Sequence, residues 1–515
     1  MDNPIKKIVI VGGGSAGWLT AGLLAAEHQA KQGQSIDITL IESANVKTIG
    51  VGEGTWPSMR NTLDRIGITE LEFIQQCDAS FKQGSKFINW QNTEANNFYY
   101  HPFMTPDGYT QADLQAYWHQ TQPQSAFADS ANVQHHLCQM GLAPKQFSTP
   151  DYAGVTNYGY HLNAGKFAAL LQTHCTTKLA VKHVIGHIAE VVTDQSGDID
   201  ELLTTDGNRL AGDLFIDCSG STGLLIDKHY KIPLLKQDQF LFNNSALATQ
   251  VPYTEDKSIA SATLSTAQTS GWIWDIGLPS RRGVGHTYSS QHLDDHLAEQ
   301  QLRDYLRQSI GSQHSEQVEV RKLSFTPGYR QKFWHKNCVA VGMSAGFIEP
   351  LEASALAMIE LSITMISEQL PQNRRQMDII AKRFNSRFTY RWQRVIEFLK
   401  LHYVLSARRD TDYWCDNQLA SSIPERLAEL LELWQHQPPS RYDFVENEEV
   451  FPSASYQYIL YGMGFHTQGR NYTSQFDNSA LAAKIFANVV QQKQQFQQGL
   501  PTNRALIDHY CQRPT

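Results

Sequence analysis

Lys7–Gly17, with the sequence KIVIVGGGSAG, decides the fold of this chain. Its β-branched run predicts a buried strand, and the glycines predict a tight turn into the helical pattern WLTAGLLAAEHQ. The next predicted strand, IDITLIE, ends in Glu42, which we expect to accept hydrogen bonds from ribose hydroxyls. Strand, glycine turn, helix, strand and acid form the βαβ dinucleotide-binding fingerprint. The sequence therefore predicts a bound dinucleotide.

The small residues of the turn each have a predicted role. Gly12 permits the tight turn, Gly14 lets the backbone approach the pyrophosphate, and Gly17 allows close packing of the helix. The pyrophosphate is expected beside Ser15 and Ala16, because the free N–H groups of a helix N-terminus favour anions.

The chain returns to this module twice. Residues 184–220 read as a series of hairpins that ends in a buried strand, Leu214–Ile216, followed by Asp217. Residues 337–342 read as another buried strand, which leads into a helix from about 353 to 370. Such returns are expected to cover the isoalloxazine end of FAD. No second GxGxxG is present, so no separate NAD(P)H domain is predicted.

Composition excludes several classes of protein. The hydrophobic fraction of 41%, the charged fraction of 18% and the net charge of -8 are typical of a globular protein that binds neither nucleic acid nor membrane. The longest apolar stretch, 356–370, is interrupted by polar residues. The seven dispersed cysteines and the immediate glycine loop predict a cytoplasmic protein without a signal peptide. His183 and His187 lack the glutamate of a zinc motif, so we expect no metal.

A second informative stretch is GWIWDI, residues 271–276. Side chains alternate along a strand, so Trp272 and Trp274 are expected on one face. Beside a flavin they would form an apolar wall that keeps a substrate ring away while small species pass. The alternative is that both tryptophans simply pack the core of a sheet.

Four motifs resemble those of the flavin-dependent halogenases typified by the tryptophan halogenases. The resemblance runs over nearly the whole chain. The glycine turn is one motif, residues 48–59 resemble the family's FAD strap, residues 271–276 resemble WxWxIP, and residues 346–355 (GFIEPLEASA) resemble FxEPLES. The combination of WxWxI with EPLE in a flavin chain is specific to this family.

The resemblance implies an α/β (α+β) fold. The expected fold is an FAD-binding Rossmann-like module of the flavin monooxygenase/halogenase type, with an interleaved substrate sheet and a helical C-terminal region. The FAD-binding module is expected within residues 1–370, built from about 1–60, 150–235 and 320–370 and interrupted by substrate-binding segments. Residues 371–515 are expected to be mainly helical and to complete the substrate pocket.

In this family reduced FAD, dioxygen and halide yield hypohalous acid, which reaches an essential lysine through a tunnel. The matching lysine is Lys82, whose desolvation would lower its pKa. Lys86 competes for this role if the stretch is helical. The matching carboxylate is Glu352, as a general base or a holder of the oxidant. Its alternative role is that of a charge at a helix N-terminus.

Other site residues follow from the same resemblance. Ser354 and Ala355 match the backbone amides that bind halide, and His101 and Phe103 match the rings that sandwich an indole. Two residues depart from the family, Gly277 for the proline of WxWxIP and Ala353 for the serine of the Glu-Ser pair. The remaining expected FAD contacts are Glu53, Gly54, Val181, Asp217, Met343 and Leu356.

The leading hypothesis is an FADH2-dependent halogenase that uses chloride or bromide on an indole-like or other electron-rich aromatic substrate. The alternatives are a flavin monooxygenase that hydroxylates an aromatic ring and a flavin-binding protein without catalysis. A separate NAD(P)H-dependent flavin reductase is the expected partner, and a homodimer is the expected assembly. Two roles are open for the tyrosines of residues 451–465: they line an aromatic pocket, or they only pack a helix. These residues are Tyr456, Tyr458 and Tyr461.

Overall fold

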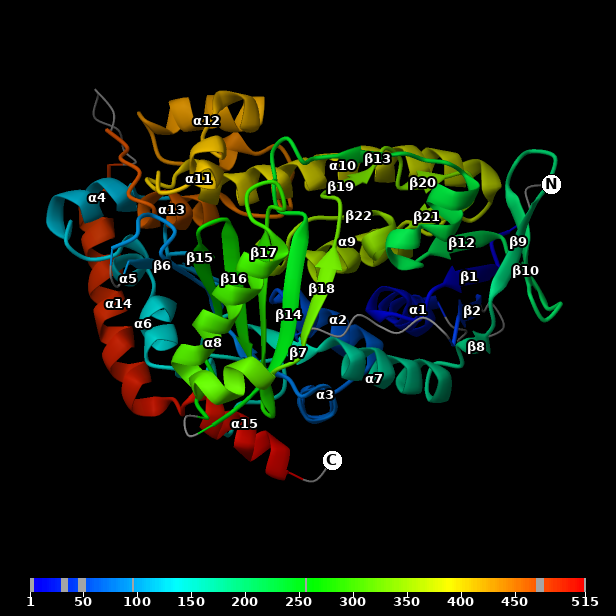
Figure 1. The fold of residues 1–515 in the computed structure, drawn as a ribbon, viewed down its shortest axis with the longest axis horizontal. Coiled ribbons are helices and arrows are strands. Elements are labelled where there is room, and N and C mark those ends of the chain that lie inside the picture. Colours follow the sequence, from blue (N-terminus) through cyan, green and yellow to red (C-terminus); the bar gives the residue numbers. More distant parts are fainter. Residues whose placement is uncertain are drawn as a thin grey trace.

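A computed structural model describes residues 4–28, 36–44, 52–94, 97–254, 257–468 and 477–513 (Figure 1). The part of the expected FAD strap at 48–51 lies outside the described residues.

The glycine fingerprint lies at the centre of a six-stranded sheet with the order β20-β21-β12-β1-β2-β8. Every pair is parallel except β20 with β21. Both predicted returns are confirmed, since the strand at Leu214 pairs with β1 and the strand at Cys338 pairs with the strand at Leu214. The bounds are β1 Lys7–Val11, β2 Asp37–Glu42, β8 Lys182–Ile185, β12 Leu214–Asp217, β20 Trp334–His335 and β21 Cys338–Ala340.

Helices cover this sheet, and the one after the glycine turn is buried on all sides over residues 17–25, as expected for a helix that is apolar all round. The helix after the glycine turn, α1 (Ser15–His28), contacts α7 (Ala164–Thr177) and α9 (Ser354–Glu368). The late helix was predicted from about 353 to 370 and is confirmed. At the outer end lies a three-stranded sheet of β9 (Ile188–Thr193), β10 (Ile199–Thr204) and β11 (Arg209–Ala211).

A second large sheet has seven strands in the order β18-β14-β17-β16-β15-β5-β6. Its strands come from distant parts of the chain, because β5 pairs in parallel with β15. The predicted interleaved sheet is therefore confirmed. The bounds are β5 Gly84–Ile88, β6 Phe98–Pro102, β14 Ser245–Pro252, β15 Thr263–Gln268, β16 Gly271–Gly277, β17 Arg281–Tyr288 and β18 Val320–Ser324.

The two faces of this sheet pack into different cores. Ile273 packs with residues of α8 (Asp295–Gln317), which covers one face. Trp272 and Trp274 belong to the main core on the other face, as alternation along β16 predicts.

Two small sheets connect the large ones. The first pairs β3 (Gly52–Gly54) and β4 (Ser80–Lys82) with β7 (Gly159–Asn163). The second joins β13 (Leu234–Lys236), β19 (Gly328–Arg330) and β22 (Gly346–Phe347). Residues 80–88 therefore form strands, so the helical spacing under which Lys86 would compete with Lys82 is wrong.

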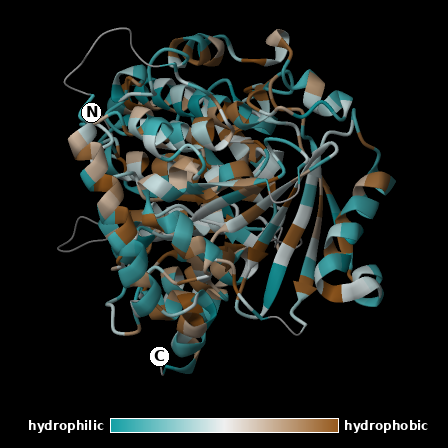
Figure 2. Cartoon of the chain, turned by 90° about the vertical axis from the view of Figure 1, so that its left-hand side faces the viewer, coloured by the Kyte–Doolittle hydropathy of each residue, from teal (hydrophilic) through white to brown (hydrophobic). Residues whose placement is uncertain are grey.

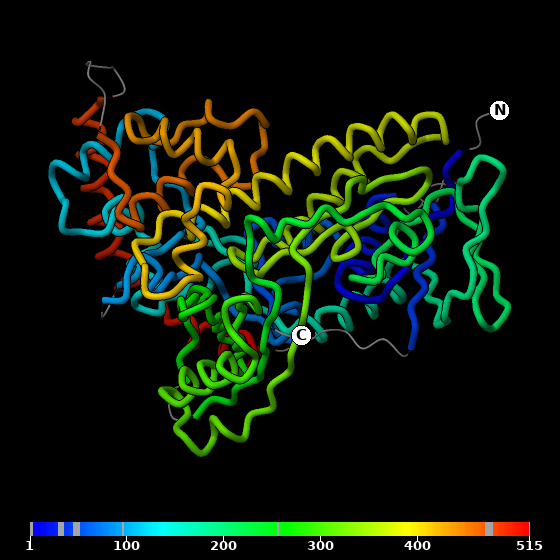
Figure 3. Tube along the Cα trace, turned by 45° about the horizontal axis from the view of Figure 1, so that its top comes forward, coloured from blue at the N-terminus to red at the C-terminus, as the bar shows by residue number. Residues whose placement is uncertain are grey.

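The described part of the chain beyond 371 contains helices and no strand. The long helix α10 runs from beside β20 in the six-stranded sheet toward α13 (Figure 3). The C-terminal helices are α10 Arg374–Val404, α11 Asp412–Asp416, α12 Glu425–Trp434, α13 Ser453–Gly462, α14 Ser479–Gly499 and α15 Asn503–Gln512.

Shorter helices fill the connections. They are α2 Ser58–Ile66, α3 Glu70–Cys77, α4 Leu114–Thr121, α5 Phe127–Ala131 and α6 Val133–Gln139, with short turns at Gly220–Thr222, Leu224–His229, Gly342–Ser344, Leu351–Ala353, Ala420–Ser422 and Arg441–Asp443. Hydrophilic and hydrophobic residues alternate along the outer helices (Figure 2). Within the described ranges no helix is long and apolar enough to cross a membrane.

Candidate active site

The glycine turn is packed on one side and open on the other. A Cβ on Gly12 would lie 2.3 Å from the Cys218 carbonyl oxygen, and one on Gly17 would lie 1.8 Å from the Gly12 carbonyl oxygen. A Cβ on Gly14 would meet nothing within 4 Å. The turn therefore leaves free space beside Gly14, at the N-terminus of α1, where a pyrophosphate requires close approach. Ser15 and Ala16 begin that helix.

Glu42 lies over the same turn. A Cβ on Gly13 would lie 1.8 Å from Glu42 Oε2, and Glu42 Oε1 lies 2.8 Å from His183 Nε2. Val181 is buried just before β8, the strand that pairs with β2. The carboxylate is thus at the edge of the sheet where a dinucleotide places its ribose.

Asp217 lies at the end of β12 and is hydrogen-bonded within its own turn. Its carboxylate is fully buried and accepts four hydrogen bonds, at 2.6–3.0 Å, from the amide and hydroxyl of Ser219 and the amides of Leu225 and Ile226. All four donors belong to the segment that follows β12, so the carboxylate is hydrogen-bonded within its own part of the chain. Asp217 therefore shapes the turn after β12, and its expected contact with the cofactor stays a prediction.

The residues expected at the flavin ring and the halide lie together. Met343, Ser354 and Ala355 line one pocket, which Trp392 also borders. Leu356 follows in α9 and is buried. The first turn of α9 therefore faces the same pocket as Met343.

The expected strap residues Glu53 and Gly54 lie on β3, which pairs with β7. Burial raises the pKa of the Glu53 carboxyl to about 7.

Lys82 is fully buried at the end of β4. Among the described residues its Nζ finds no hydrogen-bond partner, and it lies 5.2 Å from the centroid of the Phe103 ring. A Cβ on Gly54 would lie 3.1 Å from this Nζ. Burial lowers the pKa of Lys82 to about 8, although the charge of Glu352 opposes the shift. An unpartnered buried ammonium is costly, and such costs are typical of functional sites.

Lys86 lies elsewhere. It is partly exposed, and its Nζ is over the rings of Phe98 and Tyr100, at 4.2 and 5.6 Å from their centroids. The structure thus places Lys82, and not Lys86, beside Gly54 and Phe103.

Glu352 is a buried carboxylate between two histidines. Its Oε1 lies 2.8 Å from His101 Nδ1 and 3.5 Å from His402 Nε2, and its Oε2 lies 3.5 Å from Ser85 Oγ. Burial alone would raise the pKa of Glu352, but the two imidazoles hold it well below its usual range. Glu352 is therefore an anion inside the protein.

The backbone at Glu352 adopts an unusual conformation. Glu352 has φ 62° and Ala353 has φ 54°, both in the left-handed region that non-glycine residues adopt at a cost of roughly 1–2 kcal/mol each. Trp56 Nε1 donates a 2.8 Å hydrogen bond to the Glu352 carbonyl and supports this turn. Ala353 lies at the N-cap of α9, where no side-chain hydrogen bond caps the helix. Backbone strain of this kind concentrates at functional sites.

His101 is tied at both ring nitrogens. Nδ1 faces Glu352, and Nε2 lies 2.9 Å from Ser455 Oγ on α13. One ring contact is with Phe398, at 5.5 Å between centroids. Ser455 and His402 could not be predicted from the sequence, because each lies on a helix distant from its partner, His101 or Glu352, and no local motif marks either residue.

Trp272 and Trp274 form adjacent rings, with centroids 6.2 Å apart, and both are buried. Trp272 Nε1 donates a 2.7 Å hydrogen bond to Glu349 Oε2, which belongs to the 346–355 motif. At the end of the strand, the Gly277 carbonyl accepts a 2.6 Å hydrogen bond from Ser80 Oγ.

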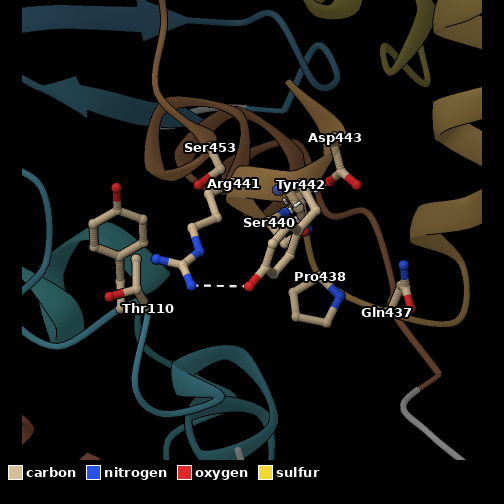
Figure 4. A pocket seen from close by; sticks show the side chains of 10 residues that line it. Thr110, Gln437, Pro438, Ser440, Arg441, Tyr442, Asp443 and Ser453 are labelled. Atoms are coloured by element: carbon tan, nitrogen blue, oxygen red, sulfur yellow. Dashed lines mark hydrogen bonds between the residues drawn. The ribbon is translucent and has the colours of Figure 1, made fainter. Parts of the chain in front are cut away.

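A cavity of about 440 Å³ opens beside the N-terminus of α13 (Figure 4). Ser453 lines it, and Arg441 points its guanidinium at the Tyr442 hydroxyl. The three tyrosines that follow Ser453 lie on helix α13 and are buried, with Tyr458 in contact with the ring of His101 at 6.2 Å between centroids. The same helix thus borders this cavity and holds His101. These are the tyrosines for which the sequence leaves a pocket or a packing role open, Tyr456, Tyr458 and Tyr461.

Comparison with known proteins agrees with this geometry. The family described as tryptophan halogenase matches residues 7–479. Tryptophan 6-halogenase SttH from Streptomyces toxytricini is 33% identical, with 90% of each chain covered. A tryptophan halogenase of known crystal structure from Shewanella frigidimarina is 50% identical, with a TM-score of 0.95 and 99% of this chain and 98% of that chain covered. A tryptophan C-6 flavin-dependent halogenase from taromycin biosynthesis is 32% identical, with a TM-score of 0.90 and 98% and 99% covered.

Proposed function

The chain belongs to the tryptophan halogenase family, and from that premise we propose how its residues halogenate an indole-like or other electron-rich aromatic ring. The enzyme is a flavin-dependent halogenase that uses FADH2 and a halide, chloride or bromide. The observation that carries the proposal is the buried Lys82, whose ammonium has no hydrogen-bond partner in the described part of the chain, near the buried anion Glu352.

The glycine turn fits the flavin cofactor. The free space at Gly14 and the first amides of α1 accept its pyrophosphate, and Glu42 accepts hydrogen bonds from its ribose. The strap residues Glu53 and Gly54, with Val181, Met343 and Leu356, contact other parts of it. When bound, FADH2 supplies the electrons with which dioxygen converts halide to hypohalous acid.

Lys82 holds and directs that oxidant. Its ammonium, in a site that excludes water, donates a hydrogen bond to the oxygen of hypohalous acid and polarises the halogen toward the ring. Phe103 covers one side of this ammonium and His101 lies beyond Glu352, so that the two rings border the substrate.

Glu352 accepts the proton that the aromatic ring loses after halogen transfer. The halide binds at the backbone amides of Ser354 and Ala355, where the N-terminus of α9 favours an anion. Trp272 and Trp274 form the wall that keeps the substrate ring apart from the flavin.

The proposed substrate is tryptophan or a related indole, since curated relatives are tryptophan 6- and 7-halogenases. The substrate enters beside α13, next to the cavity that Ser453 lines. A separate NAD(P)H-dependent flavin reductase supplies FADH2, because the sequence holds one dinucleotide fingerprint. We further propose a homodimer and a cytoplasmic location, the latter supported by seven unpaired cysteines.

One experiment tests the proposal. The purified chain is given FAD, a flavin reductase with NADH, chloride or bromide, and a panel of indoles that includes tryptophan, and the products are weighed by mass spectrometry. Incorporation of halogen supports the proposal. Incorporation of oxygen into the ring indicates a hydroxylating monooxygenase, and peroxide alone indicates a flavin-binding protein without this catalysis; either result overturns it.

A further inference from the structure

A tyrosine and a histidine from distant parts of the chain lie behind Glu352. The Tyr99 hydroxyl, on β6, lies 2.6 Å from His402 Nδ1, on α10. The other ring nitrogen, His402 Nε2, lies 3.5 Å from Glu352 Oε1. Tyr99, His402 and Glu352 therefore form one buried row, in which the imidazole lies between a phenol and a carboxylate.

The chemistry of the row fixes the position of each proton. The Glu352 anion, 3.5 Å from Nε2, favours the imidazole tautomer with its proton on Nε2, which leaves Nδ1 as the acceptor. The Tyr99 hydroxyl, whose pKa burial raises well above its usual value, then donates to Nδ1. A neutral imidazole that accepts at Nδ1 carries its own proton on Nε2. This Nε2 lies 3.5 Å from Glu352 Oε1 without hydrogen-bond geometry, so its N–H acts on the carboxylate as a nearby dipole.

The surroundings hold the imidazole in this orientation. His402 is fully buried, and its ring packs against Phe87 at 4.5 Å and against Trp90 at 5.8 Å between centroids. The titratable groups that face it are Tyr99, Glu352 and His101. Burial lowers the pKa of His402 despite the carboxylate, so the ring is neutral and presents an N–H dipole rather than a charge to Glu352.

We propose that Tyr99 and His402 form a positioning pair that sets the imidazole tautomer and thereby holds the Glu352 carboxylate as an oriented anion for proton abstraction. The inference rests on the proposed function of Glu352 as the general base. His101 meets Glu352 from the other side and is tethered to Ser455. The carboxylate is thus held between two imidazoles.

Activity measurements test the pair with a matched control. Tyr99→Phe removes only the hydroxyl that fixes the tautomer, while Tyr100→Phe changes the neighbouring buried tyrosine, whose ring contacts Phe98 and His135. We expect Tyr99→Phe to lower product formation by up to about tenfold, as the loss of a hydrogen bond between neutral groups does, and Tyr100→Phe to leave it unchanged. Without the Nε2–H dipole the pKa of Glu352 rises, so the acid limb of the pH profile moves to higher pH.

Substitutions of His402 itself separate positioning from packing. The amide nitrogen of His402→Gln extends toward the place of Nε2, and that of His402→Asn toward the place of Nδ1. We expect the glutamine variant to retain more activity than the asparagine variant at similar thermal stability. Equal losses in both variants, or a Tyr99→Phe enzyme with the rate and pH profile of the parent, would overturn the proposal.

A spectroscopic measurement makes the inference independent of turnover. With ¹⁵N-labelled histidine, NMR of the full chain should show His402 with Nε2 protonated and Nδ1 as an acceptor, and a mixture of tautomers in Tyr99→Phe. A chain that halogenates no substrate while His402 shows this tautomer contradicts the proposed function alone. A protonated Nδ1 in the parent chain contradicts the positioning pair.

Discussion

Trp272 Nε1 donates a 2.7 Å hydrogen bond to Oε2 of Glu349, and this bond joins the two motifs that are most specific to the family. Tyr403 and Asn243 donate to the same oxygen, each at 2.7 Å. The strand that carries Trp272 is therefore tied by this bond to the segment that carries Glu352.

Trp272→Phe should destabilise the fold more than Trp274→Phe. Both substitutions shrink a buried ring on the same face of β16, but only Trp272 has an indole N–H donated to a carboxyl group. The lost bond to an acidic group costs about 1.5–3 kcal/mol, and it raises further the pKa of Glu349, which burial already raises. Urea denaturation of both variants measures the difference, and equal free energies of unfolding would contradict the anchoring role of the indole N–H.

Lys82→Ala should abolish halogenation and leave FAD binding and peroxide formation intact, because Lys82 acts on an oxidant that is already made. The pH profile of the parent enzyme gives a second test. Burial lowers the pKa of Lys82 to about 8, so the ammonium is lost, and product formation falls, as the pH rises through that value. Peroxide and product are measured together from pH 6 to 10. Substantial halogenation by Lys82→Ala would remove the lysine from the mechanism.

Glu352→Gln should lower product formation by about 10²–10⁴, the range for a lost general base, while peroxide rises. It should also move the alkaline limb of the pH profile to lower pH, because the charge of Glu352 raises the pKa of Lys82. Rates measured under saturating reduced flavin isolate this step from flavin supply. An unchanged rate would reduce Glu352 to a charge near the N-terminus of α9.

The sequence predicts the local parts of this site well and the distant parts poorly. The turn from Gly12 to Gly17 and the position of Glu42 follow from one continuous motif, because each residue acts on its near neighbours. The contact between Tyr99 and His402 spans 303 positions and joins a strand to a helix. No sequence pattern in either segment predicts it.

Two other residues show why residue type alone misleads. Asp217 ends a buried strand, where a residue that contacts a cofactor is expected, and its carboxylate accepts hydrogen bonds from backbone amides of its own turn. The segment around Lys82 is too short for its periodicity to separate strand from helix, and pairing with β7 decides the outcome. In both cases tertiary contacts, absent from the local pattern, determine what the side chain does.

Gly54→Ala should impair halogenation while the fold persists. The added Cβ would lie 3.1 Å from Lys82 Nζ and 3.2 Å from the Ala353 Cβ, which is closer than ordinary contact. The end of the lysine chain is the flexible partner, so Nζ moves and the oxidant is held in the wrong place. A misplacement of this kind costs up to about 10²-fold in rate.

The control is Gly165→Ala, where the nearest atom, Asn163 Oδ1, is at an ordinary 3.5 Å and the site lies in the first turn of α7. Thermal melts and FAD titration of both variants exclude unfolding and loss of the cofactor, and product formation at saturating reduced flavin gives the effect on Lys82. We expect similar melting temperatures, with the rate reduced only in Gly54→Ala. Equal rates in the two variants would show that Lys82 does not need the space that glycine leaves beside it.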